Sequence, residues 1–250
     1  MMAYVTSQQF GPYLQECDGI VADLDGTLVK GRVAEGMGKK FLKSELRRLH
    51  LRHAWSGLRN YKKVLKTGRG GEPYKGRSGQ AAGLELFTDI MAGTGCATRG
   101  MMKAYARERI KESVLPGARE FIWHLKGTGK PVVCVTAGCS SAAEEAKEFF
   151  GFDSAWGNPM RYSEEGMLLG CDIVFDERTK LSETEDRLHR FYGLSINRCL
   201  VIGNDDLDVP LMLMSRLSAS GPLATPQARD RAEVRIDDYV TFLRDIRGTD

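Results

Sequence analysis

Two carboxylates, Asp23 and Asp25, stand directly behind a short apolar run at residues 19–22. In an extended strand, residues two apart point to the same side, so one carboxylate could attack a substrate while the other moves a proton. Attack on phosphorus also requires a cation to neutralise the negative phosphoryl oxygens, and Mg²⁺ held by carboxylates meets that need. The pair therefore predicts phosphoryl chemistry, although the same residues could form a structural Asp-rich turn.

Two further apolar runs also end in polar residues. The run at 131–135 is followed by Thr136, and the run at 199–202 leads to the stretch from Asn204 to Asp208. Strand-like and helix-like segments alternate from residue 115 onward, and Ser141 to Glu144 matches a capping box that would open one of the helices. This alternation predicts βαβ crossovers and a parallel sheet, whose polar strand ends are expected to converge on one ligand site.

The sheet pattern is interrupted between residues 31 and 113. Apolar residues recur at helical spacing from Phe41 to His53, and a second helical region is predicted from Leu84 to Ser113. The sequence therefore predicts an α/β fold in which a basic, mainly helical cap at residues 31–113 is inserted into a core. The core comprises residues 1–30 and 114–250.

The first part of the insertion is strongly basic. Residues 31–82 contain 14 Lys and Arg against 3 Asp and Glu, a local net charge of +11. Because the whole chain carries +3, the remainder carries −8. Such an asymmetry indicates a boundary between modules, and the basic module favours an anionic partner such as a phosphate ester, a lipid surface or nucleic acid.

Composition and cysteine content limit the class of protein to which the chain can belong. With 42% hydrophobic and 28% charged residues, the chain is typical of a globular protein. We expect no signal peptide, because residues 1–19 contain no basic region followed by an apolar run. We expect no spanning segment, because no apolar stretch approaches roughly 18–20 residues. The 6 cysteines never form a C-x-x-C pair, so a reduced, cytoplasmic protein without structural zinc is expected.

Four parts of the sequence resemble the motifs of the haloacid dehalogenase superfamily of phosphatases. They are DLDGTL at 23–28, VVCVTAG at 132–138, Lys180 at a predicted helix start, and GNDDLDVPLM at 203–212. The resemblance covers roughly residues 19–30 and 114–246 of the chain. Within the superfamily, the place of the insertion and the stretch from Glu165 to Gly170 are most similar to the phosphoserine phosphatase-like branch. This resemblance implies a Rossmann-like core with a cap of the C1 type.

The resemblance also implies roles for the motif residues. Asp23 would be the nucleophile and a metal ligand, while Asp25 would exchange protons as acid and base and bind the metal through its backbone carbonyl. The Thr136 hydroxyl, the Ala137 amide and Lys180 would hold phosphate oxygens. The implied cofactor is Mg²⁺.

Asn204 is a departure from the family, which usually has a metal-binding Asp at this position. An amide oxygen can ligate Mg²⁺ but brings no charge, so a lower metal affinity is expected. Asp205 and Asp208 could compensate, and the motif spacing favours Asp208. The predicted metal ligands are therefore Asp23, Asp25, Asn204, Asp205 and Asp208.

A second departure concerns the substrate. Phosphoserine phosphatases usually have a Glu about nine residues after the nucleophile to bind the amino group, whereas this chain has Arg32, with Glu35 as the nearest acid. Arg32 and Glu35 are therefore candidate substrate-contacting residues, and phosphoserine is not the expected substrate.

Together these observations predict an Mg²⁺-dependent phosphomonoester hydrolase that forms an aspartyl-phosphate on Asp23. The expected substrate is a small or lipid-linked anionic phosphate ester. Two alternatives stay open. One is a catalytically weak binding or regulatory protein whose basic cap contacts an anionic surface or nucleic acid, and the other is a phosphotransferase.

Overall fold

The structure is a computed structural model of the 250-residue chain, and it describes residues 4–47 and 79–248. Its centre is a 6-stranded sheet in the order β3-β2-β1-β6-β7-β8, in which every neighbouring pair is parallel. The strands are β1 (Gly19–Ala22), β2 (Val132–Cys139), β3 (Ser154–Asn158), β6 (Cys199–Gly203), β7 (Leu217–Ser220) and β8 (Val234–Arg235). The predicted α/β class with a parallel sheet is confirmed.

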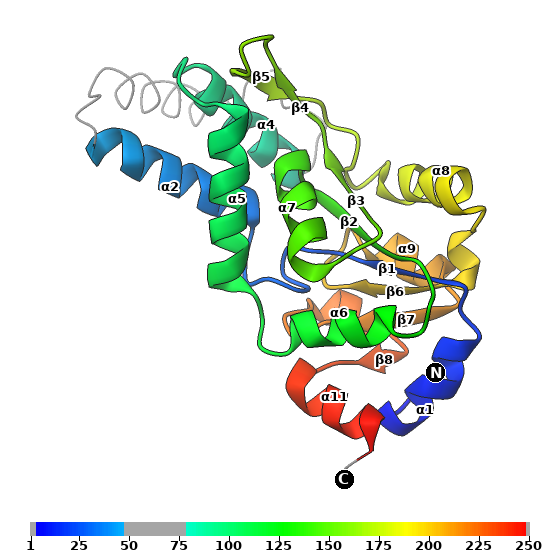
Figure 1. Cartoon of the computed structure of the whole chain (residues 1–250). Coiled ribbons are helices and arrows are strands. Elements are labelled where there is room, and N and C mark those ends of the chain that lie inside the picture. Colours follow the sequence, from blue (N-terminus) through cyan, green and yellow to red (C-terminus); the bar gives the residue numbers. More distant parts are fainter. Residues whose placement is uncertain (1–3, 48–78, 249–250) are drawn as a thin grey trace.

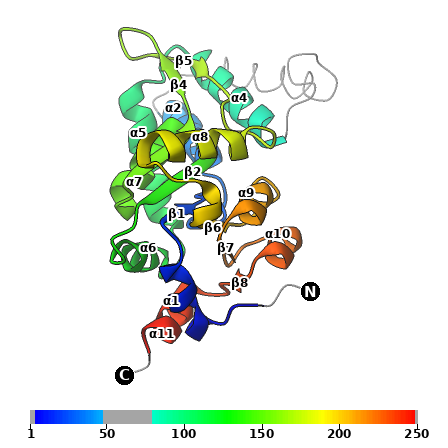
Figure 2. The ribbon, with the colours of Figure 1, turned by 90° about the vertical axis from the view of Figure 1, so that its right-hand side faces the viewer.

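Both faces of the sheet are buried, which explains why its central strands are short apolar runs. Side chains alternate between two apolar clusters: Ile20 and Ala22 of β1 belong to one cluster, and Val21 belongs to the other. Helices cover both faces (Figures 1 and 2). One face is covered by α1 (Ser7–Gln15), α6 (Ala118–Lys126), α7 (Ser140–Phe150) and α11 (Tyr239–Arg247), and the other by α8 (Lys180–Tyr192), α9 (Val209–Met214) and α10 (Pro226–Arg231).

A second group of elements stands beside one end of the sheet (Figure 1). It contains the helices α2 (Val33–Arg47), α4 (Gly79–Ala92) and α5 (Arg99–Ser113), together with the antiparallel strands β4 (Met160–Tyr162) and β5 (Leu168–Cys171). Strand β5 packs on α4, so the hairpin joins these helices although it lies in the part of the chain assigned to the core. The boundaries of the predicted cap stay a prediction, and residues 48–78 of its basic segment lie outside the described residues.

The helical region predicted from Leu84 to Ser113 is helical and consists of two helices, because the chain turns at Gly95, which has a φ of 64°, and Thr98 caps the second helix by accepting a hydrogen bond from the Met101 N–H. One local expectation was wrong. The capping box at residues 141–144 does not form, since α7 already begins at Ser140 and its N-cap residue makes no side-chain cap hydrogen bond. The strand expected at 131–135 also continues to residue 139, through the predicted phosphate-binding segment.

The two chain crossings between the helical group and the sheet lie side by side. Lys30 donates its N–H to the Ser113 carbonyl at 2.7 Å, and Leu115 donates to the Leu28 carbonyl at 2.9 Å. Arg109 of α5 adds a hydrogen bond from its guanidinium to the Lys30 carbonyl at 2.9 Å. These contacts hold the start of α2 at the edge of the sheet where the site residues lie.

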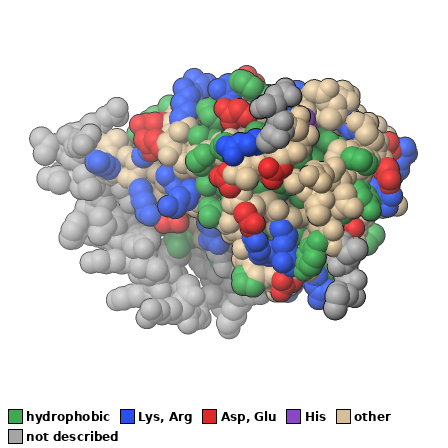
Figure 3. Space-filling model, turned by 90° about the horizontal axis from the view of Figure 1, so that it is seen from below, with side chains coloured by type: hydrophobic (Ala, Val, Ile, Leu, Met, Phe, Trp, Pro, Cys, Tyr) green, Lys and Arg blue, Asp and Glu red, His purple; other side chains and the backbone are tan. Residues whose placement is uncertain are grey.

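The described surface is of mixed charge on the face seen from below Figure 1 (Figure 3). Acidic and basic side chains alternate there without an extended area of one sign among the described residues. Within residues 4–47 and 79–248, no helix is both long and apolar enough to cross a membrane. Because residues 48–78 of the basic segment lie outside the described residues, its expected contact with an anionic surface stays a prediction.

Candidate active site

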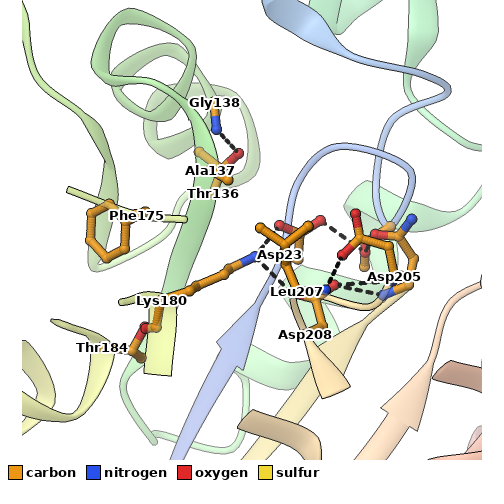
Figure 4. A network of polar contacts seen from close by, with 12 residues as sticks. Asp23, Thr136, Ala137, Gly138, Phe175, Lys180, Thr184, Asp205, Leu207 and Asp208 are labelled. Carbon is orange, nitrogen blue, oxygen red and sulfur yellow. Dashed lines mark hydrogen bonds and ion pairs between the residues drawn. The ribbon is translucent and has the colours of Figure 1, made fainter. Parts of the chain in front are cut away.

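The predicted site residues come together at the carboxyl ends of three neighbouring strands (Figure 4). Asp23 follows β1, Thr136 and Ala137 belong to the last part of β2, and Asn204 follows β6. Lys180 is the first residue of α8 and reaches toward the strand ends from the side. Parallel strands bring such residues together because their carboxyl ends share one edge of the sheet.

A buried ion network ties the lysine to two carboxylates. The Lys180 ammonium lies 2.8 Å from Asp23 Oδ1 and 2.6 Å from Asp208 Oδ1. The other Asp208 oxygen accepts the Asn204 backbone N–H at 2.8 Å. Lys180, Asp208 and Asp23 are only 3%, 2% and 7% exposed, so each charge depends on its partners for solvation. Asp208 therefore fixes the lysine that contacts Asp23.

Burial changes the proton affinity of these groups. It raises the pKa of Asp23 well above the usual value, with a further rise from Asp208, while Lys180 opposes both. Burial alone would lower the pKa of Lys180, but the carboxylates of Asp208 and Asp23 raise it above its usual value. The lysine is therefore held as a cation in contact with Asp23.

Asp25 has a different environment from Asp23. Burial raises its pKa to about 6, although a hydrogen bond from the Val33 N–H opposes the rise. That N–H is the first of helix α2 and lies 2.9 Å from Asp25 Oδ1. A Cβ added to Gly138 would lie 3.2 Å from Asp25 Oδ2 and 3.1 Å from Thr136 Oγ1, so this carboxylate adjoins the predicted phosphate-binding segment. A carboxyl group with a pKa near 6 can exchange a proton close to neutral pH.

Oxygen atoms also converge around the side chain of Asn204. The outer atom of its amide lies 2.9 Å from Thr27 Oγ1, 3.0 Å from the Asp25 carbonyl oxygen and 3.2 Å from Asp23 Oδ2. If the amide presents nitrogen there, it donates hydrogen bonds to these acceptors. If it presents oxygen, that atom lies at roughly the 3 Å separation of adjacent Mg²⁺ ligands from one oxygen of Asp23 and one of Asp25.

With the Asn204 amide oxygen turned toward Asp23 and Asp25, the three residues would offer a hard cation such as Mg²⁺ one carboxylate, one backbone carbonyl and one amide oxygen. Without a cation, the surrounding acceptors favour the amide nitrogen at this place. This donor set differs from a metal centre made of side chains alone, because no group of three or more His, Cys, Asp or Glu side chains converges as a metal site in the described part of the chain.

The remaining predicted residues lie apart from this cluster or have other contacts. Arg32 is exposed just before α2, where its charge acts on Asp25 and lowers the pKa of that carboxyl. Glu35 is exposed and forms an ion pair with Lys39 at 2.6 Å. Asp205 accepts the Leu207 N–H at 3.0 Å through its Oδ1 atom.

The sequence alone did not single out three residues of the site, which are Thr27, Val33 and Asn158. Thr27 donates its hydroxyl hydrogen toward Asp23 Oδ2 at 3.1 Å or Asn204 at 2.9 Å, and its place four residues after Asp23 could have suggested this. No sequence signal could have pointed to the Val33 N–H, because almost any residue would supply this backbone group. Asn158, which ends β3, could have been noticed only as another polar residue at a strand end.

Comparisons with known proteins identify the family and the fold. The family model for haloacid dehalogenase-like hydrolases matches residues 20–213. A substrate-bound complex of phosphoserine phosphatase superposes with a TM-score of 0.60 at 18% identity, covering 92% of this chain and 98% of that one. A phospho-aspartyl intermediate analogue of phosphoserine phosphatase gives 0.58 at 19% identity, covering 92% and 99%. A protein of unknown function from Bordetella pertussis Tohama I gives 0.63 at 17% identity, covering 88% and 97%. No curated protein sequence matches the chain.

Proposed function

The chain belongs to the haloacid dehalogenase-like hydrolase family, and we propose that it is an Mg²⁺-dependent phosphomonoester hydrolase working through an aspartyl-phosphate on Asp23. The observation that carries this proposal is the buried contact of Lys180 with Asp23 at 2.8 Å, with Asp25 and Thr136 on the adjoining strand ends. A nucleophilic carboxylate, a proton-exchanging carboxyl and a fixed cation are the groups that phosphoryl transfer requires.

In the first step, a carboxylate oxygen of Asp23 forms a bond to phosphorus while the bond to the ester oxygen breaks. Asp25 donates its proton to the departing oxygen, which leaves as an alcohol. In the second step a water molecule gives a proton back to Asp25 and attacks phosphorus, and the bond to Asp23 breaks to release inorganic phosphate. Lys180, the Thr136 hydroxyl and the Ala137 amide hold the phosphoryl oxygens through both steps.

The proposed ligands of Mg²⁺ are Asp23, the Asp25 carbonyl and the Asn204 amide oxygen. When bound there, the ion would supply positive charge against the phosphoryl oxygens and the carboxylates. Asp208 is better suited to holding Lys180, because both of its oxygens already accept hydrogen bonds. The metal roles predicted for Asp205 and Asp208 remain predictions.

The proposed substrate is an anionic phosphate ester other than phosphoserine. The exposed cation of Arg32, whose field reaches Asp25, supports this proposal because it would attract a second anionic group and repel an ammonium group. Likeness to phosphoserine phosphatases at 18–19% identity concerns the fold and leaves the substrate open. A comparison of phosphoserine with glycerol phosphate, phosphosugars and lipid head-group phosphates tests the point. Preference for phosphoserine, retained in Arg32→Gln, would contradict it.

Hydrolysis of p-nitrophenyl phosphate tests the reaction itself. We expect the wild type to release phosphate in the presence of Mg²⁺ and Asp23→Asn to lose the activity by at least about 10³-fold, because the nucleophile is absent. Asp206→Asn, an exposed change in the loop after β6, is the matched control and should retain activity. Equal rates for the wild type and Asp23→Asn would refute the proposal.

The same preparations separate the alternatives. A binding or regulatory protein would show no hydrolysis at any Mg²⁺ concentration together with salt-sensitive binding to anionic vesicles or RNA. A phosphotransferase would transfer the phosphoryl group to an added alcohol instead of releasing inorganic phosphate.

A reducing, cytoplasmic location is part of the proposal, and it is supported by the free state of all 6 cysteines.

A further inference from the structure

Asn158, the last residue of β3, uses its whole side-chain amide to join two separate segments. Its Nδ2 donates to the Ala137 carbonyl at 2.8 Å and to the Phe175 carbonyl at 3.1 Å. Its Oδ1 accepts the N–H groups of Val174 and Phe175, each at 2.7 Å. The residue is fully buried, and these four hydrogen bonds satisfy both donors and both acceptor sites of the amide.

The first segment is the part of β2 that contains Thr136 and Ala137. The pairing of β2 with β3 shifts register between Val135 and Cys139, so the intervening residues leave the regular ladder. Such an irregularity exposes backbone groups that regular pairing would use. The Asn158 amide takes up one of them, the Ala137 carbonyl, and thereby fixes the orientation of the peptide that follows it.

The second segment leads directly to Lys180. Thr179 donates its hydroxyl hydrogen to the Val174 carbonyl at 2.7 Å, and the Lys180 N–H is bonded to the Asp176 carbonyl at 2.9 Å. The turn that begins α8 is therefore tied to Val174, which is one of the two residues that Asn158 holds. Figure 4 shows Ala137 on the first segment and Phe175 and Lys180 on the second.

We propose that Asn158 is a positioning residue that sets the distance between the two phosphate-holding groups, the Thr136–Ala137 segment and Lys180. This inference rests on the proposed function, because it assigns both groups to one phosphoryl group. Asn158 itself touches neither substrate nor metal. No other side chain of this size supplies two donors and two acceptor sites, since ionised Asp has no donor and Leu has neither.

Two substitutions that nearly preserve volume divide the four hydrogen bonds. Asn158→Leu removes all of them, whereas Asn158→Asp retains an acceptor for the N–H groups of Val174 and Phe175 but loses the donations to the Ala137 and Phe175 carbonyls. We expect both variants to lower kcat/KM for p-nitrophenyl phosphate by about 10²-fold, because a displacement of about 1 Å has that effect on positioned groups. Both should also weaken competitive inhibition by inorganic phosphate. Ser218→Ala is the control, since it removes a buried hydroxyl from β7, away from both segments.

Hydrogen exchange gives a readout that does not depend on activity. In Asn158→Leu, exchange should accelerate in both segments, 134–140 and 172–181. In Asn158→Asp it should accelerate mainly in the first segment. Ser218→Ala should change neither. A general structural role would instead accelerate exchange across the sheet in all three variants in proportion to their loss of stability.

The outcomes distinguish this inference from the proposed function. A wild type without phosphatase activity would overturn the proposed function, and the exchange pattern would then decide the inference alone. Unchanged kcat/KM and phosphate inhibition in Asn158→Asp, or unchanged exchange at 134–140, would overturn the inference while the phosphatase stands. If Asn158→Leu does not fold, Asn158→Asp carries the comparison, because its neutral form at acid pH is nearly isosteric with Asn158.

Discussion

Asn204 offers the sharpest test of the oxygen cluster, because replacing it by Asp changes one charge and almost no volume. The outer amide atom lies 3.2 Å from Asp23 Oδ2, so the new carboxylate would stand close to the first one. At an effective dielectric constant of about 20, two like charges about 4 Å apart repel by about 4 kcal/mol. Lys180 already neutralises part of the Asp23 charge. We therefore expect Asn204→Asp to lower the free energy of unfolding by about 2–4 kcal/mol without metal.

Addition of Mg²⁺ should reverse this loss. A carboxylate ligand adds attraction for the ion, and each tenfold gain in affinity adds about 1.4 kcal/mol of stabilisation at saturating Mg²⁺. The assay is urea unfolding followed by tryptophan fluorescence, first with a chelator and then over a range of Mg²⁺ concentrations. We expect Asn204→Asp to be less stable than the wild type in the chelator and to respond to Mg²⁺ at a concentration at least about tenfold lower.

The matched control is Asn197→Asp, the same chemical change at an exposed position. Its stability should follow that of the wild type at every Mg²⁺ concentration, because an exposed charge is solvated and screened. Equal loss of stability by Asn204→Asp with and without Mg²⁺ would refute the assignment of Asn204 as a ligand. So would an Mg²⁺ response of the same size in Asn197→Asp.

Two further predictions concern the groups that hold the lysine. Asp208→Asn leaves the buried ammonium with one carboxylate, so we expect a loss of about 3–5 kcal/mol in urea unfolding and a fall in activity, whereas the exposed change Asp206→Asn should cost less than about 1 kcal/mol. Burial would raise the pKa of Asp176, but hydrogen bonds from the backbone N–H groups of Arg178 and Thr179 and the charge of Arg178 lower it below its usual value. A lowered pKa stabilises the fold above the ordinary Asp value of about 3.9 and loses that effect as pH falls. The stability advantage of the wild type over Asp176→Asn should therefore be present at pH 6 and shrink between about pH 4 and 2; an advantage that is constant across this range would contradict the assignment.

The fold could be predicted because its central strands can be recognised from the local sequence. Residues 19–22 and 199–202 are short, uninterrupted apolar runs, which are typical of strands buried on both faces. Parallel pairing brings the carboxyl ends of such strands to one edge, which is why Asp23 and Asn204 could be expected to converge on one site. The family membership inferred from the motifs is confirmed by the match over residues 20–213.

Features that depend on tertiary contacts could not be predicted in the same way. The pattern at residues 141–144 satisfies the rule for a capping box, but the extension of β2 to residue 139 starts the helix earlier and places Ser141 inside it. The Ser141 hydroxyl instead lies 3.2 Å from the Tyr162 hydroxyl of the hairpin. The local rule for helix starts therefore failed because the preceding strand, which continues to residue 139 within the sheet, determined where the helix begins.

The polar residues after β6 show that residue type and spacing alone do not identify the metal ligands of a site. Asn204, Asp205 and Asp208 could all ligate a metal as isolated residues. Their surroundings separate them, because Asp208 is held by Lys180, Asp205 accepts an N–H within its own turn, and only Asn204 faces the oxygens of Asp23 and Asp25. In the proposed function the uncharged Asn204 is therefore the candidate metal ligand, whereas Asp208 holds Lys180, whose ammonium contacts Asp23.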